Sequence, residues 1–420
     1  MKITRITLGL LLAVAAATAR SQSAAPMQFE RLTLPSALEA LRETNRQIRV
    51  ARSAVDVAST EILRARALPN PTLSGQVSNT SAGRYNLPGT DRIVRLEQVF
   101  ERGGKRDLRV GFAGAAEQAV RFDLADVTRQ QRAALASAYY DLVSAQRIES
   151  IAQENVAGYQ RLVEAAERRL RAGDIAAVDL SRLRVESNRA INEARAAQAA
   201  VAEARIALAA VLGVEAQAER IRAVDDFPEL QAPQAMSPDR LDAAMSRRAD
   251  AAAALARLTA LDRARMLAES QRTRDVTLGV QAERAPSFGG NVFGLSASIP
   301  LLVNNDYSGD IARARADHAQ ASEELERIRG VIRSEVERNS AQLAAAFDRA
   351  RRMLDSGLPE ARKAAEAVEY AFNRGAAALT DLFDARRQFA AVRVEAITAQ
   401  ADYAKALNAY RESLALEEIH

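Results

Sequence analysis

The sequence has no cysteine, no tryptophan and only two histidines among its 420 residues. The lack of cysteine excludes thiol catalysis, thiolate metal sites and disulfides together. Neither histidine stands at a metal-ligand spacing from the other, and no Ser/His/Asp constellation or phosphate-binding loop stands out. We therefore do not expect an enzyme, and we expect no catalytic residues, no cofactor and no bound metal.

Large side chains are also scarce, since aromatic residues make up 5% of the chain and charged residues 27%. A chain with so few large side chains cannot fill several thick globular cores, whereas alanine-rich helices can pack closely. This composition is typical of long helices and coiled coils. Acidic and basic residues are interspersed, and the formal net charge is only +4. We therefore expect no nucleic-acid partner.

Long apolar runs are missing too, because none beyond the leader reaches the length of a transmembrane helix. At the N-terminus, Lys2 and Arg5 precede an apolar run over residues 6–17, and small residues follow. This arrangement predicts a cleaved secretory signal peptide over residues 1–23. Without cysteine the new N-terminus cannot be lipidated, so any membrane insertion has to use β-strands.

What the sequence does contain is one structural plan that occurs twice. The first repeat spans 24–212 and the second 239–420, with a proline-rich connector over 213–238. Helical periodicity covers 34–67 and 105–171 in the first repeat, and 238–274 and 308–374 in the second. Between these helices, residues 72–100 and 275–301 alternate polar and apolar side chains around a turn, which predicts two β-hairpins.

A glycine interrupts each long helical pattern, and these two glycines, Gly173 and Gly375, lie 202 residues apart. In both repeats an aspartate follows the glycine by six residues and a leucine by seven. Beyond each glycine, positions spaced three and four residues apart form a coiled-coil seam, and the two seams match at the same offset. We interpret residues 171–180 and 372–384 as the tips of two long helical hairpins.

Four amphipathic strands of about nine or ten residues suit a tilted crossing of a bilayer. An open four-stranded sheet would leave two unpaired edges in lipid, so closure requires other copies of the chain. The predicted fold is mainly α with a small β part. It has long α-helical barrel or coiled-coil hairpins and four membrane β-strands per chain, and a trimer closes a 12-stranded β-barrel. An exported coiled-coil scaffold without a pore is the alternative.

The stretch from Leu96 to Arg106, with its Gly-Gly-Lys-Arg run, resembles the strand-to-helix junction of the TolC family of outer-membrane efflux channels. The doubled plan and the glycine turns resemble that family over essentially the whole mature chain. The Gly-Gly-Lys-Arg run is most similar to its cation-efflux (CzcC-like) branch. The resemblance implies a homotrimer in the bacterial outer membrane, with a barrel in outer-membrane lipid and a helical part in the periplasm.

The same resemblance implies a passive exit duct of a tripartite efflux system, with metal cations as one possible cargo. Its partners would be a periplasmic adaptor (membrane fusion protein) and an inner-membrane pump of the RND type. The outer channel of a type I protein secretion system is an alternative within the same fold.

The resemblance also assigns residues to the closed tip of the channel. Asp381 and Asp384 share a helix face, and in a three-fold assembly each would form a ring of carboxylates that favours cations. Phe372 stands where the family's best-known pattern has tyrosine, and Ala377 where it has arginine, which Arg374 could replace. The expected pore and gate residues are Asp381, Asp384, Asp179, Phe372 and Arg374. The expected adaptor contacts are Leu170, Gly173, Leu180, Gly375 and Leu379.

Overall fold

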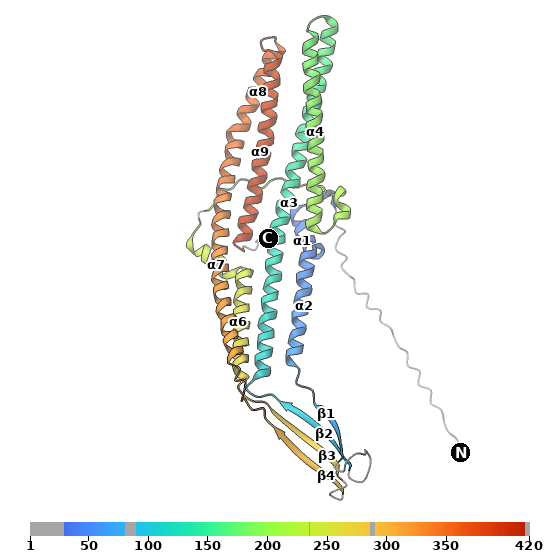
Figure 1. Ribbon diagram of the computed structural model, residues 1–420. Helices are drawn as coiled ribbons and strands as arrows, with labels where there is room; N and C mark the ends of the chain where they lie inside the picture. The colour runs from blue at the N-terminus through green and yellow to red at the C-terminus, as the bar shows by residue number, and fades with distance from the viewer. Residues whose placement is uncertain (1–28, 80–89, 235, 286–289, 416–420) are drawn as a thin grey trace, which may run out of the picture.

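The computed structural model describes residues 29–79, 90–234, 236–285 and 290–415, and the expected signal peptide lies outside these ranges. The molecule is elongated, with two helical hairpins reaching to one end and a β-sheet at the other (Figure 1). The helices are α1 (Leu34–Thr44), α2 (Arg46–Arg66), α3 (Lys105–Ala172), α4 (Ala177–Leu212), α5 (Pro238–Arg247), α6 (Ala249–Ser270), α7 (Ser308–Arg352), α8 (Leu358–Asn373) and α9 (Leu379–Ser413). The strands are β1 (Thr72–Asn79), β2 (Thr90–Phe100), β3 (Val276–Ala285) and β4 (Gly290–Ser298).

The two long hairpins are built from α3 with α4, and from α7 and α8 with α9. Helix α3 runs without a break for 68 residues, which corresponds to about 100 Å. The predicted seams are largely buried, at Leu180, Leu183, Ser187, Ala190, Ala197, Val201 and Leu208 of α4 and at Leu382, Ala396, Ala399, Tyr403 and Tyr410 of α9. The prediction of a mainly α fold with long helical hairpins is confirmed. Among the described residues, no helix is both long and apolar enough to cross a bilayer.

The sequence predicts continuous helices over 34–67 and 238–274. Both predictions are wrong, because each helix breaks near its start. The helix predicted over 34–67 ends at Asn45, whose side chain accepts a hydrogen bond from the Ile48 N–H at 2.9 Å and caps α2. The helix predicted over 238–274 breaks at Arg248, which is 1% exposed and pairs with Asp250 and Glu335 at 2.7 and 2.8 Å. Both breaks let the chain change direction at the middle of the molecule.

The predicted helix over 308–374 is also interrupted, by a π-helical turn at Met353–Gly357 between α7 and α8. Pro359 lies in the first turn of α8 and has no backbone N–H to donate, which favours a local departure from α-helical pairing. The first repeat has no such turn, because α3 passes through the equivalent region as a regular helix. The two hairpins therefore differ in this one feature of their backbones.

The four strands form one antiparallel sheet in the order β1-β2-β3-β4. The two hairpins lie side by side because β2 pairs with β3, for instance Leu96 with Val280. β1 and β4 are the two edges, and each pairs with a single strand among the described residues. One chain therefore builds a short open sheet, as the strand count predicted.

The two faces of this sheet differ sharply in polarity. On one face Leu96 lies opposite Leu73 of β1 and Val280 of β3, and Val280 lies opposite Leu295 of β4. This apolar face is exposed in the single chain, with Phe293 81% and Leu295 89% accessible. The other face carries polar side chains at Thr72, Ser74, Gln76, Arg95, Glu97, Thr277, Gln281, Glu283, Ser296 and Ser298.

The junction between sheet and helices is held by a partly buried ion pair between the two repeats. Lys105 at the start of α3 lies 2.8 Å from Asp275, which directly precedes β3, and the Arg102 backbone N–H donates to the same carboxylate. Burial acts to raise the pKa of Asp275, but these hydrogen bonds outweigh it and hold the pKa below its usual range. Gly103 has a φ of 73°, and a Cβ there would lie 2.8 Å from a Thr273 side-chain atom. Glycine is therefore required at this position.

The connector is anchored at the middle of the molecule by Asp225. Its carboxylate accepts hydrogen bonds from the Leu34 backbone N–H at 2.6 Å and from the Tyr139 hydroxyl at 2.9 Å. Tyr139 is fully buried, and burial together with this hydrogen bond raises its pKa. A main-chain bridge from Leu32 to Ala223 adds a second tie. These contacts fasten α1, α3 and the connector to one core.

We predict that Lys105→Met lowers the free energy of unfolding by about 3 kcal/mol, because it leaves the partly buried Asp275 without its ammonium partner. Lys363 provides a matched control, since it also lies 2.8 Å from its partner, Glu360, but both side chains are about 70% exposed. Lys363→Met should change stability by less than about 1 kcal/mol. Denaturant unfolding followed by circular dichroism measures the free energy of unfolding of both variants. Equal losses in the two variants would contradict a structural role for the junction.

Candidate functional site

The two predicted glycine turns have the same backbone structure. Gly173 and Gly375 have φ of 84° and 74°, a left-handed conformation that suits glycine. At the first turn the Gly173 N–H donates to Leu170 O at 3.0 Å, and the N–H of the next residue donates to Arg169 O at 2.8 Å. The second turn repeats both bonds at 2.9 Å, from Gly375 to Phe372 O and from the next residue to Ala371 O. Each is a Schellman motif that ends a long helix.

Each of the three predicted acidic residues has a defined partner on its own helix. Asp381 accepts a hydrogen bond from the Ala378 backbone N–H at 3.2 Å, which helps to start α9. Asp384 pairs with Arg387, and Asp179 lies 3.9 Å from Arg182, in both cases one helical turn further along. Asp381 and Asp384 are exposed, and Asp179 is half-buried.

The predicted gate residues at the C-terminal end of α8 lie beside a tyrosine that the sequence reasoning missed. Arg374 places its guanidinium over the ring of Tyr370, 4.6 Å from the centroid. Tyr370 is 60% exposed and stands two residues before the half-buried Phe372. An aromatic residue four positions before an arginine on a helix is a signal that could have suggested this contact.

The predicted adaptor contacts fall into two groups. Gly173 and Gly375 are exposed at the ends of the hairpins. Leu180 is buried in one cluster with Tyr159 and Phe383, and Leu170 and Leu379 are partly buried against that cluster. These leucines join α3 and α4 to α9, so in this structure they stabilise the tips from below the surface.

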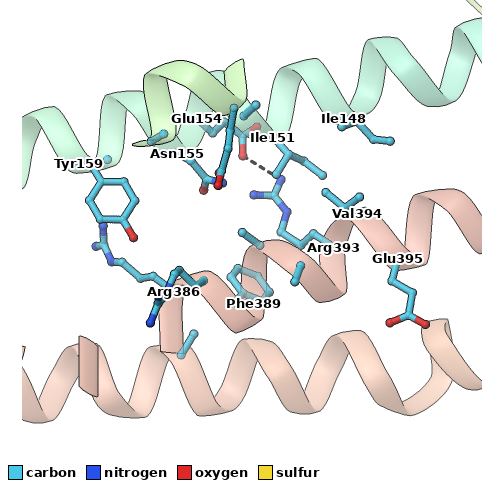
Figure 2. A pocket seen from close by; sticks show the side chains of 18 of the residues that line it. Ile148, Ile151, Glu154, Asn155, Tyr159, Arg386, Phe389, Arg393, Val394 and Glu395 are labelled. Carbon is cyan, nitrogen blue, oxygen red and sulfur yellow. Dashed lines mark ion pairs between the residues drawn. The ribbon is translucent and has the colours of Figure 1, made fainter. Parts of the chain in front are cut away.

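A cavity of about 1130 Å³ separates the two hairpins below their tips, lined by residues of α3, α4, α8 and α9. Figure 2 shows Arg393 of α9 reaching toward Glu154 of α3, with which it forms an ion pair of 2.8 Å. Arg386 of α9 pairs instead with Glu369 of α8 at 2.7 Å. The Glu154–Arg393 pair therefore connects the hairpins directly across the cavity. Sequence reasoning missed it because no motif relates the two residues.

Above this pair the hairpins meet again through aromatic side chains. The Tyr159 and Phe383 rings lie 6.2 Å apart, and burial raises the pKa of Tyr159, with a further contribution from Glu186. The tyrosine therefore stays neutral through the physiological range. Within the described ranges, no group of three or more acidic or histidine side chains is placed to hold a metal ion. The cavity offers paired charges and aromatic surface.

Long helical hairpins with glycine turns, standing on a sheet whose apolar face is exposed, are the features of an outer-membrane channel protein. The model of the outer membrane efflux protein family matches residues 37–214 and 241–416, and the chain belongs to this family. The two matched segments correspond to the two halves of the structure. The resemblance inferred from the sequence is thereby confirmed.

Individual relatives agree with this assignment. The chain is 28% identical over 374 residues to the cobalt-zinc-cadmium resistance protein CzcC of Cupriavidus metallidurans, which covers 86% of this chain and 85% of the relative. The fold of this chain matches that of the outer-membrane channel OprN with a TM-score of 0.75 and 19% identity, over 91% of this chain and 89% of the OprN chain. The CmeC outer membrane channel of Campylobacter jejuni matches with a TM-score of 0.76 and 14% identity, over 91% and 85%.

We predict that removing the Glu154–Arg393 pair loosens the second hairpin. The Glu154 side chain is 57% exposed, so the pair contributes at most about 1 kcal/mol, a change of up to about five-fold in the population of separated hairpins. Spin labels at Asp174→Cys and Ala376→Cys report the separation without interference, because the chain has no native cysteine. Glu154→Gln should broaden the distance distribution.

The matched control for this measurement is Glu149→Gln. Glu149 also lies on α3, but among the described residues it accepts a hydrogen bond from Gln153, one turn along the same helix, at 3.1 Å. The Glu149→Gln variant should leave the distances between the two spin labels unchanged. Identical distributions for both variants and the wild type would show that the ion pair does not restrain the hairpins.

Proposed function

We propose that three copies of this chain form the exit duct of a tripartite efflux system. Twelve strands would close a barrel in the outer membrane, and the helical hairpins would form a tunnel in the periplasm. A periplasmic adaptor (membrane fusion protein) would meet the hairpin tips, and an inner-membrane pump of the RND type would supply the energy. The chain itself would act as a passive path.

The observation that carries this proposal is the open sheet with one exposed apolar face. Unpaired backbone groups at the edges of β1 and β4 cannot be left in lipid, where no water can satisfy them. Pairing β1 of one copy with β4 of the next satisfies both edges and extends the alternation of the faces. The polar face, which carries Arg95, Glu97 and Gln281, would then line the lumen.

The tips support a role as the entrance. Asp381 and Asp384 lie on the exposed first turns of α9, directly after the second glycine turn. The hydrogen bond to Ala378 engages one oxygen of Asp381 and leaves its negative charge in place. Rings of such carboxylates in a three-fold assembly would attract cations. Asp179 would add to this field, and Phe372 and Arg374 would shape the opening.

Metal cations are the cargo that we propose for this duct. CzcC is by its name a cobalt-zinc-cadmium resistance protein, and it aligns over most of both chains. The exposed glycine turns at Gly173 and Gly375 would present backbone surface to the adaptor. The leucines Leu170, Leu180 and Leu379 would support that surface from within the tip, since they pack against one another in one cluster.

We predict that the purified chain forms cation-selective channels in planar bilayers. Asp381→Asn combined with Asp384→Asn keeps the size and capping ability of both side chains but removes their charge, so it should lower the cation-to-anion permeability ratio roughly two-fold or more. Asp317→Asn is the control, because Asp317 also pairs with an arginine of its own helix, 3.8 Å from Arg313, but lies far from the tips on α7.

Two results would count against this account in different ways. An unchanged permeability ratio in the double variant would remove Asp381 and Asp384 from the mechanism while leaving the duct intact. A wild-type chain that inserts into bilayers but conducts no ions under any applied voltage would contradict the duct itself.

A further inference from the structure

Four exposed arginines gather where the helices meet the sheet. They are Arg66 at the end of α2, Arg102 just after β2, Arg106 in the first turn of α3, and Arg274 just before β3. The Arg106 Nε donates a hydrogen bond to the Arg66 backbone oxygen at 2.9 Å, which joins the two helices. The Arg102 backbone N–H donates to Asp275 at 2.9 Å, which joins the two strands. We call the four arginines the arginine cluster.

Three acidic side chains beside the arginine cluster have partners outside it. They form ion pairs with other basic residues, in the pairs Asp275–Lys105, Glu101–Arg109 and Asp306–Arg272. Asp107, in the first turn of α3, adds one more negative charge. In the described part of the chain, no acidic side chain forms an ion pair with Arg66, Arg102 or Arg274. The arginine cluster therefore keeps a net positive charge at the base of the helices.

The apolar face of the sheet begins next to the arginine cluster. Phe100 pairs with Val276 in the last register row of β2 and β3, and Arg102 and Arg274 lie two residues beyond these positions. At about 3.3 Å per residue, the two arginines follow the end of the apolar face by about 7 Å. Phe100 is 51% and Leu278 48% exposed, so exposed apolar surface reaches to the edge of the cluster.

This position matches the boundary of a hydrocarbon layer on the side of the helices. Beyond Phe100, the next positions of β2 on the apolar face are uncharged, at Gln98, Leu96 and Val94. Charged residues on the lipid-facing side of an outer-membrane sheet are well tolerated only near the boundaries of its apolar band. If this face meets lipid, as the proposed function requires, the arginine cluster stands at the level of the headgroups nearest the helices.

We propose that the arginine cluster binds the phosphate groups of anionic phospholipids in the membrane leaflet nearest the helices. Guanidinium groups offer paired N–H donors that match phosphate oxygens. Each basic residue at a membrane surface strengthens the binding of anionic lipid by about five-fold. The acyl chains of a bound lipid would lie along Phe100 and Leu278, beside the cluster. Bound lipid would thereby fix the depth at which the sheet sits in the membrane.

The test measures how lipid stabilises the assembly in detergent micelles of increasing phosphatidylglycerol content. Phosphatidylglycerol should raise the thermal unfolding midpoint, while phosphatidylcholine and inorganic phosphate at equal concentration should not. Arg102→Gln combined with Arg274→Gln should raise the phosphatidylglycerol content needed for half of this effect by about ten-fold or more. Because both side chains are exposed, the midpoint without lipid should stay the same.

The matched control removes two arginines at the opposite end of the molecule. Arg168 and Arg171 are exposed at the end of α3 that lies farthest from the sheet (Figure 1). Arg168→Gln with Arg171→Gln changes the net charge by the same amount and should leave the phosphatidylglycerol dependence unchanged. An equal weakening in the control would assign the effect to overall charge and would overturn the site.

Substitution by lysine separates charge from guanidinium geometry. Arg102→Lys with Arg274→Lys keeps both charges, so its phosphatidylglycerol dependence should lie between those of the wild type and the glutamine variant. The same dependence in the wild type and the glutamine variant would overturn the site. Stabilisation of equal size by inorganic phosphate would assign the arginines to a free anion and would overturn the lipid proposal.

Flotation with phosphatidylcholine vesicles separates this inference from the function on which it rests. If the wild type and all variants fail to float, membrane insertion is contradicted and the lipid site falls with it. If all float equally and the phosphatidylglycerol dependence is the same in each, the lipid site alone is contradicted and the duct stands.

Discussion

The backbone hydrogen bonds at the two edges of the sheet are the constraint on which the rest of the structure depends. β1 and β4 are eight and nine residues long, and alternate residues of each direct their N–H and C=O groups outward, where the described residues of one chain offer no partner strand. Each such group would cost several kcal/mol if left unpaired in lipid. The exposed apolar face, with Leu295 and Phe293, is more stable in lipid than in water. Pairing with further copies removes this cost and encloses the polar face.

The sheet determines where the helices begin. Lys105 and Asp275 lock the start of α3 to the start of β3, so the two repeats leave the sheet at a fixed position. From there α3 continues without a break to its glycine turn, whereas the second repeat has the π-helical turn at Met353–Gly357. This difference gives the hairpin that carries Asp381 and Asp384 a less regular backbone than its counterpart. The Glu154–Arg393 pair then connects the two hairpins across their cavity.

Features that depend on local periodicity could be predicted from the sequence, and those that depend on distant partners could not. Alternation defines the strands, and the coiled-coil seams define α4 and α9, because both patterns are local. The break at Asn45 could be predicted from the sequence, since asparagine is a preferred residue at the N-cap of a helix. The equivalent break at Arg248 involves Glu335, 87 residues away, as well as the nearby Asp250, and no local pattern reveals the distant partner. The cavity and its ion pair were missed for the same reason, because they exist only once the hairpins are placed.

The central claim is that the edges of this sheet pair with further copies of the chain, so that three copies close one barrel. Native mass spectrometry of the assembly, extracted from the outer membrane in mild detergent, counts the chains directly. We predict a closed complex of three chains, because three open four-stranded sheets supply the twelve strands of the barrel. A stable monomer, or a complex of another number of chains, would contradict it.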